Sequence, residues 1–264
     1  MNPSLHRLWV CLPAFVLLCA AVPAGAQDRL AEAVNRSAHT QMLAERITRT
    51  YAMLGQSVIP ARTKRQLDAD IVAFEADLKA LAVIPMNPEQ KENLALLGQT
   101  WGELKAVVTK PATLAGAKTL TDTSEELAYI ADKNITLLRK GGASLRSDAV
   151  VLAGAARTLS QRMAKLYFYR TWGLKTEAIV NDLKAAEEEY RVSMRKLATS
   201  PQNDDSIRAD LALADSQWVF FSQALTRLGT GEAKMQSMDN VGKTSDALLD
   251  VLESLARKYE ASKS

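Results

Sequence analysis

Residues of the types that carry out catalysis or bind metal ions are scarce in this chain. His6, Cys11 and Cys19 all lie in the first 26 residues, which have the pattern of a signal peptide. His39 is then the one histidine left in the mature chain, and no thiol remains. This inventory does not suggest a metal cluster, haem ligation or a Ser-His nucleophile pair. We therefore predict that the protein is not an enzyme and has no cofactor.

The first 26 residues are typical of a secretory signal peptide. A weakly basic start ending at Arg7 is followed by an uncharged apolar run over 8–22 and by small residues up to Ala26. The run is too short to span a bilayer comfortably, and we expect cleavage after Ala26. An uncleaved N-terminal anchor is the alternative. Without Arg7 the mature chain has a net charge of +2, from 32 basic and 30 acidic residues, which gives no reason to expect nucleic-acid binding. The predicted location is the periplasm.

The mature chain contains two related halves. Three sequence elements recur in the same order at spacings of 116, 117 and 121 residues: LAERI at 43 and LSQRM at 159, LAL at 94 and 211 with Trp101 and Trp218, and TSE at 123 and TSD at 244. Three matches at nearly one offset indicate an internal duplication. The predicted units are residues 27–142 and 143–264.

Each half is predicted to consist of four helices. Ala and Leu are abundant, alternating β-branched runs are almost absent, and glycines and prolines fall at regular intervals. The breaks occur at Gly55 to Pro60, at 85–88, at 111–116 and at 141–142, and in the second half at Gly173, 201–205 and 229–231. Helices of about 20 to 30 residues suit antiparallel bundles. The predicted fold is all-α, with two tandem antiparallel four-helix bundles.

Helical periodicity predicts which faces are buried. In the second half, one stripe carries Leu152, Ala155, Leu159, Met163 and Leu166, and the opposite face carries Gly154, Arg157, Thr158, Gln161 and Lys165. In the first half, Leu43, Ile47 and Leu54 are predicted to be buried, and Ala38, Gln41, Met42, Glu45 and Arg49 to lie on the other face. Trp101 and Trp218 are interpreted as core residues. Glu187 to Glu189 are interpreted as a solvated face rather than a cation site.

These helices resemble a known sensory family. The segment VNRSAHTQMLAERI at 34–47 is similar to the pattern INxAGxxRMxSxR, which opens the sensory domains of PilJ-like chemotaxis transducers and NarX-type nitrate and nitrite sensor kinases. The segment AGAARTLSQRM at 153–163 resembles the same pattern and keeps its glycine and both arginines. The resemblance implies periplasmic four-helix sensory bundles, present here in two tandem copies.

In the nitrate sensors this first helix meets its counterpart from a second bundle, and an arginine three residues after the glycine helps to bind the anion. By resemblance, Arg157 is that arginine and Gly154 is its small neighbour. A guanidinium can present paired donors to a planar oxyanion, and a glycine lets two backbones approach closely.

The first copy departs from the pattern. It has Gln41 in place of the arginine, Ala38 in place of the glycine, and Glu45 where a neutral residue is usual. If the two first helices pair, Glu45 would come near Arg157 and Gln161 and could neutralise the arginine. A two-arginine site would then need either a homodimer that brings two Arg157 side chains together, or Arg46 and Arg162. For Arg46 and Arg162, bonds to helix carbonyls or to a neighbouring acid are the alternative role.

Two functional hypotheses follow. The first is a periplasmic sensory or ligand-binding protein that holds a small anion, such as nitrate or nitrite, or another polar ligand between the duplicated first helices. It would report binding to a membrane chemoreceptor or sensor kinase. The second is a helical scaffold or adaptor without a small-molecule ligand. An unpaired Arg157 facing a pocket would favour the first, and an Arg157 closed by Glu45 would favour the second.

Overall fold

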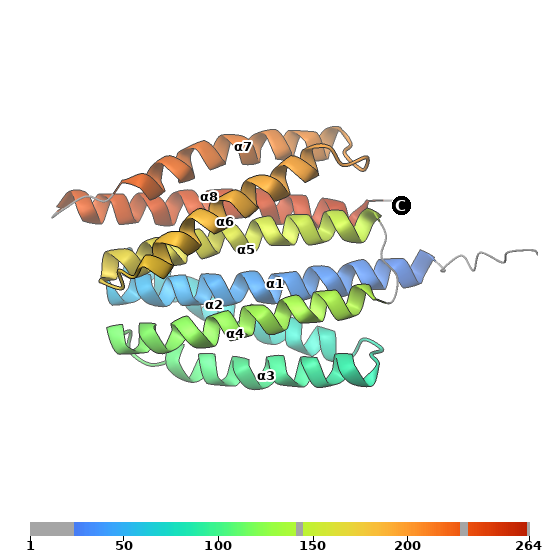
Figure 1. Cartoon of the computed structure of the whole chain (residues 1–264), viewed down its shortest axis with the longest axis horizontal. Coiled ribbons are helices and arrows are strands. Elements are labelled where there is room, and N and C mark those ends of the chain that lie inside the picture. Colours follow the sequence, from blue (N-terminus) through green and yellow to red (C-terminus); the bar gives the residue numbers. More distant parts are fainter. Residues whose placement is uncertain (1–23, 141–144, 228–231, 263–264) are drawn as a thin grey trace, which may run out of the picture.

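The computed structural model describes residues 24–140, 145–227 and 232–262. Within these ranges the chain is all-α, which confirms the predicted fold class. The described helices are α1 (Ala24–Gly55), α2 (Pro60–Ala82), α3 (Pro88–Val108), α4 (Leu114–Arg139), α5 (Leu145–Trp172), α6 (Glu177–Ala198), α7 (Asp205–Thr226) and α8 (Glu232–Ala261). They lie roughly side by side, with α6 crossing at an angle (Figure 1).

The helix ends follow from local sequence chemistry. At the start of α3, Asn87 and Gln90 form a capping box, in which each side chain accepts a hydrogen bond from the other's backbone N–H, and Pro88 occupies the first helical position. The side chains of Thr113, Thr176 and Asp204 cap α4, α6 and α7. The predicted breaks therefore coincide with helix ends, except those at 141–142 and 229–231, which lie outside the described residues.

Helices α1 and α5 form the centre of the molecule and pack together more extensively than any other pair. They run parallel, because Ala38 in the middle of α1 lies against Gly154 of α5, and Gly55 at the C-terminal end of α1 lies against Trp172 at the C-terminal end of α5. Helix α1 also packs on α2 and α4, with α3 outside them, and α5 packs on α6 and α8, with α7 outside them (Figure 1). These contacts fit a helical bundle of two four-helix groups joined along an α1–α5 seam.

Two matched aromatic contacts support the predicted duplication. Phe74 stacks on Trp101 with ring centroids 4.0 Å apart, and Tyr190 stacks on Trp218 at 4.4 Å. The second pair follows the first by 116 and 117 residues, the offset of the repeated motifs. Both tryptophans are buried, as predicted for core residues. The domain boundaries themselves stay a prediction.

The predicted outward faces of the two first helices were wrong. Arg157, Gln161, Lys165, Glu45 and Arg49 are each at most 1% exposed. The prediction assumed that each helix buries a single stripe, as a helix on the surface of a domain does. Helices α1 and α5 instead have neighbours on several sides, so their polar residues are enclosed as well.

Gly154 allows the close approach of α1 and α5. A Cβ atom at Gly154 would lie 2.6 Å from Cβ of Ala38, which is fixed to the α1 backbone and cannot move alone. We expect Gly154→Ala to lower the free energy of unfolding by roughly 1–3 kcal/mol, although alanine is the better helix former. The measurement is urea unfolding.

The matched control for that substitution is Gly98→Ala on α3, where a Cβ would meet no atom within 4 Å. This variant should be more stable by up to about 1 kcal/mol, because only helix propensity changes. If both alanine variants gain stability equally, the two central helices do not approach each other as closely as described.

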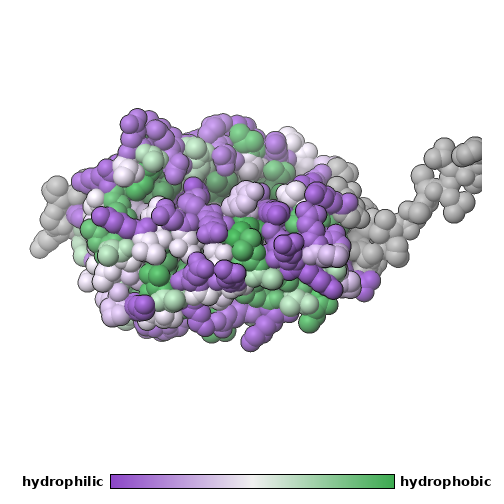
Figure 2. All heavy atoms as spheres, turned by 60° about the horizontal axis from the view of Figure 1, so that its bottom comes forward, coloured by the Kyte–Doolittle hydropathy of each residue, from purple (hydrophilic) through white to green (hydrophobic). Residues whose placement is uncertain are grey.

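The predicted signal peptide, including Cys11 and Cys19, lies outside the described residues except for its last three positions. Among the helices in the described part of the chain, none is both long enough and apolar enough to cross a bilayer. On the face shown in Figure 2, hydrophilic side chains predominate and hydrophobic ones are dispersed among them.

Candidate functional site

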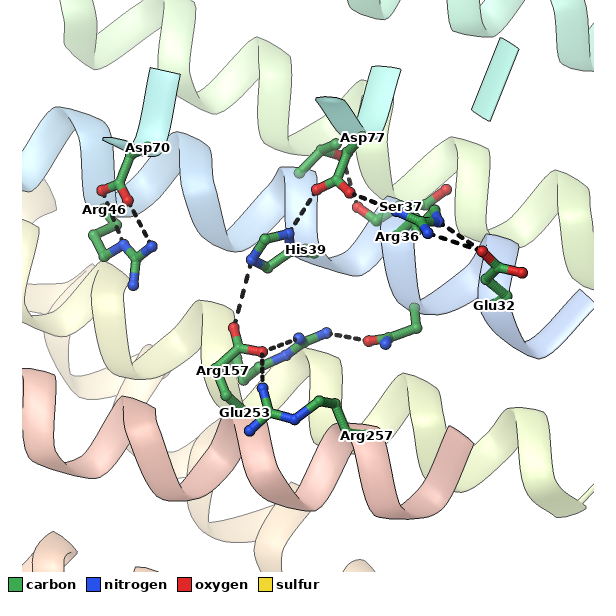
Figure 3. Close-up of polar contacts among 12 residues, drawn as sticks. Glu32, Arg36, Ser37, His39, Arg46, Asp70, Asp77, Arg157, Glu253 and Arg257 are labelled. Atoms are coloured by element: carbon green, nitrogen blue, oxygen red, sulfur yellow. Dashed lines mark hydrogen bonds and ion pairs between the residues drawn. The ribbon is translucent and has the colours of Figure 1, made fainter. Parts of the chain in front are cut away.

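The predicted anion-binding arginine is enclosed by partners from the protein itself. Arg157 is 1% exposed; its Nη1 lies 2.9 Å from Oε2 of Glu253 on α8, and its Nη2 donates to Oδ1 of Asn35 on α1 at 2.7 Å (Figure 3). Burial alone would raise the pKa of Glu253, but the charges of Arg157 and His39 outweigh it and hold that pKa below its usual value. The guanidinium is therefore neutralised by an internal carboxylate.

His39 extends this network to α2. Its Nδ1 lies 2.6 Å from Oδ2 of Asp77, and its Nε2 lies 3.6 Å from Oε1 of Glu253 (Figure 3). Farther along, Asp246 of α8 pairs with Arg49 of α1 at 2.9 Å and with Arg62 of α2 at 2.8 Å. Polar contacts thus connect α2, α1 and α8 along one side of the seam.

Glu45 does meet α5, as predicted, but not at Arg157. Its Oε2 lies 2.7 Å from Nζ of Lys165, and its Oε1 lies 3.1 Å from Nη1 of Arg162. Both cations also contact Glu125 on α4, at 3.0 and 2.7 Å. Glu45 and Lys165 are almost fully buried, so the cluster formed by Glu45, Glu125, Arg162 and Lys165 joins the two halves inside the molecule.

The parallel alignment of the central helices brings Glu45 next to Arg162. Ala38 lies opposite Gly154, so Glu45, seven residues later on α1, is level with Gln161, seven residues later on α5. Arg157 is four residues away, or about 6 Å along the axis. Arg162 is one residue from that level, and Lys165 is four residues from it on the other side. Arg157 is held instead by Glu253 and Asn35.

Burial and the surrounding charges act in opposite directions on this cluster. Burial would lower the pKa of Arg162, but the carboxylates of Glu45 and Glu125 outweigh it and raise that pKa further above its usual value. Burial would raise the pKa of Glu125, but Lys165 and Arg162 hold it low. Arg162 and Glu125 are therefore both charged at neutral pH.

The remaining predicted residues have separate roles. Arg46 donates to both carboxylate oxygens of Asp70 on α2, at 2.9 and 2.6 Å, which is the structural role considered for it. Burial nevertheless raises the pKa of Asp70. Gln161 donates to the backbone carbonyl of Ser245 on α8. The two-arginine site built from Arg46 and Arg162 is not formed within the chain, because each arginine has its own carboxylate partners.

Three predicted residues do share a cavity. Gln41, Glu45 and Arg162 line a cleft of about 360 Å³ on the side of the seam away from α2 and α8. Helices α1 and α5 form its floor, and α4 and α6 stand on either side, so both halves contribute. We call it the seam cleft; the other lining residues are Ala128, Asp132, Ala155, Thr158, Leu159, Asp182, Ala185, Ala186 and Glu189.

The seam cleft is acidic. Four of its lining residues are carboxylates and one, Arg162, is a cation, which gives a formal charge of −3; the carboxylates are Glu45, Asp132, Asp182 and Glu189. Partial burial raises the pKa of Asp132. Thr158 is 6% exposed, and its hydroxyl has no hydrogen-bond partner within the protein. A buried hydroxyl of this kind would gain from a bound ligand.

The acidic residues of the seam cleft were not predicted from the sequence, although the spacing of charged residues around two of them gave an indication. Neither Asp132 nor Glu189 has a lysine or arginine three or four positions away, so neither can form the usual ion pair along its own helix. Glu187 and Glu188 do pair with Arg191 and Arg195, as expected for a solvated face. Glu189 differs from its two neighbours because it faces the cleft.

Comparison of the chain with protein-family models, with curated proteins and with solved structures gives no match.

Proposed function

We propose that this protein is a sensory or ligand-binding protein of the periplasm that holds a small polar ligand in the seam cleft. It reports binding to a membrane chemoreceptor or sensor kinase. The resemblance of the two first helices to PilJ and NarX-type sensory domains supports this class of function. The buried, unpartnered Thr158 hydroxyl in a cavity built by both halves is the observation that carries the proposal.

The position of the seam cleft suits a sensor. Helix α4 belongs to the first half and α6 to the second, so one ligand can contact both halves at once. A ligand that binds one spacing of α4 and α6 better than another shifts the equilibrium between the two. A membrane partner that binds one of these two spacings more tightly than the other would then respond to the ligand.

A thermal-shift screen with small polar solutes of both charges tests the proposal. A ligand that binds the native state raises the melting temperature. A hit should be lost in Ala185→Trp, which fills the cleft without changing its charge, and should persist in Ala209→Trp, an equally large change on an exposed position of α7. The proposal fails if no solute in the panel stabilises the wild-type protein.

The rival function is a helical scaffold or adaptor. One observation in its support is that Glu253 and Asn35 already pair with the Arg157 guanidinium. Another is that three apolar side chains of α7 are exposed: Leu213, Val219 and Phe220. Such a protein would bind another helical protein through its outer faces. A screen with no stabilising solute, combined with loss of partner binding in Phe220→Ser, would favour this function.

A further inference from the structure

We infer that the seam cleft binds an organic cation carrying two or more amino groups, rather than the oxyanion suggested by the family resemblance. This inference rests on the proposed function, since it names the class of ligand for the same cleft. Its first support is charge: four carboxylates and one guanidinium line the cavity. An anion entering this cleft would be repelled, and a cation would be attracted.

Arg162 does not supply the free positive charge that an oxyanion needs. Its Nη1 atom is already shared between Glu45 and Glu125, and its Nη2 lies 3.8 Å from Asp182. The other arginine expected at the seam, Arg157, is buried against Glu253. Binding of nitrate would therefore require an existing ion pair to break, which is strongly unfavourable for buried groups.

Thr158 is the second, independent support. Its side chain lines the cleft from α5, is 94% buried, and lacks a hydrogen-bond partner in the protein. A hydroxyl oxygen accepts a hydrogen bond readily from an ammonium group, which has donors only. The carboxylates of Asp132 on α4 and of Asp182 and Glu189 on α6 add further acceptors from the two neighbouring helices.

The lining also excludes two other kinds of cation. Within the described ranges, no group of three or more His, Cys, Asp or Glu side chains could hold a metal ion. No aromatic ring lines the seam cleft, although quaternary ammonium ligands are usually enclosed by such rings. A primary or secondary amine, which can donate hydrogen bonds, fits the carboxylates and the threonine better.

The distribution of the acids favours more than one amino group. Asp132 lies on α4, and Asp182 and Glu189 lie on α6, so the carboxylates border the cleft on both sides. A cavity of about 360 Å³ is within the usual size range of small-molecule sites. A short, linear diamine or triamine could reach both sides at once and hold α4 and α6 together.

Calorimetry and thermal shift with 1,4-diaminobutane and spermidine test this inference, with tetramethylammonium and nitrate as probes of the excluded classes. The expected result is stabilisation by the two amines only. The double variant Asp132→Asn/Glu189→Gln should weaken amine binding about tenfold or more, because one acid is lost on each side. Thr158→Val should weaken it as well.

The matched control is Glu103→Gln/Glu188→Gln, which removes two exposed carboxylates elsewhere and changes the net charge equally. It should leave amine affinity unchanged. Equal weakening by both double variants would mean nonspecific attraction and would overturn the inference. Binding of nitrate without binding of amines would overturn the inference and leave the proposed function standing. Absence of any stabilising solute would remove both.

Discussion

Glu45→Ala is expected to lower the free energy of unfolding by about 3–5 kcal/mol, because it leaves a buried ammonium group without its nearest counterion. Glu45 is 0% exposed and Lys165 is 1% exposed, and their charged atoms lie 2.7 Å apart. In the variant, the one counterion left to Lys165 among the described residues is Glu125, whose side chain is 41% exposed. Urea unfolding followed by circular dichroism measures the difference.

Two further variants separate the loss of an ion pair from the loss of packing. Glu45→Leu combined with Lys165→Met replaces both charges by apolar groups of similar size, and should recover most of the lost stability. Lys64→Ala, which removes an exposed partner of Asp68 on α2, should change stability by less than about 1 kcal/mol. A loss of that small size in Glu45→Ala would show that the pair is not buried as described.

Arg157→Leu is expected to destabilise the protein by roughly 3 kcal/mol and to leave ligand binding in the seam cleft unchanged. The substitution leaves Glu253 with two more distant partners, His39 at 3.6 Å and Arg257 at 3.9 Å, in a site where a poorly paired carboxylate is unfavourable. The cleft is lined by other residues of α5, so its chemistry stays intact. Unfolding and calorimetry on the same samples measure the two effects.

The control for Arg157→Leu is Arg195→Leu on α6, which removes an arginine paired with Glu188 on the solvent-exposed surface. It should cost less than about 1 kcal/mol. The opposite result for Arg157→Leu, with near-normal stability and abolished ligand binding, would place the ligand at Arg157, as the family resemblance implied.

The helices themselves could be predicted from the sequence because their signals are local. Pro60, Pro88 and Gly173 mark helix starts or ends through their own backbone chemistry. The core role of Trp101 and Trp218 also followed from their positions inside apolar helical patterns. The contact between the two first helices was expected at Glu45, which does meet α5.

The polar interior could not be predicted in the same way. The partners of Arg157 come from positions 35 and 253, and no periodicity relates residues so far apart. Lys165 was assigned to an outward face because it lies opposite the apolar stripe of its helix. Its burial is possible because Glu45 of α1 and Glu125 of α4 pair with it. It could therefore be known only from the packing of α1, α4 and α5.

The two sides of the α1–α5 seam differ in a way that fixes how the halves can move. On one side, His39, Asp246 and their ionic partners bind α8 to α1 and α2, whereas on the other side the cavity separates α4 from α6. Glu125 of α4 and Asp182 of α6 each contact Arg162 of α5, so within the described residues the two cleft-bordering helices are linked by ion pairs only through this one side chain. We therefore expect the spacing of α4 and α6 to vary more easily than that of α1 and α8.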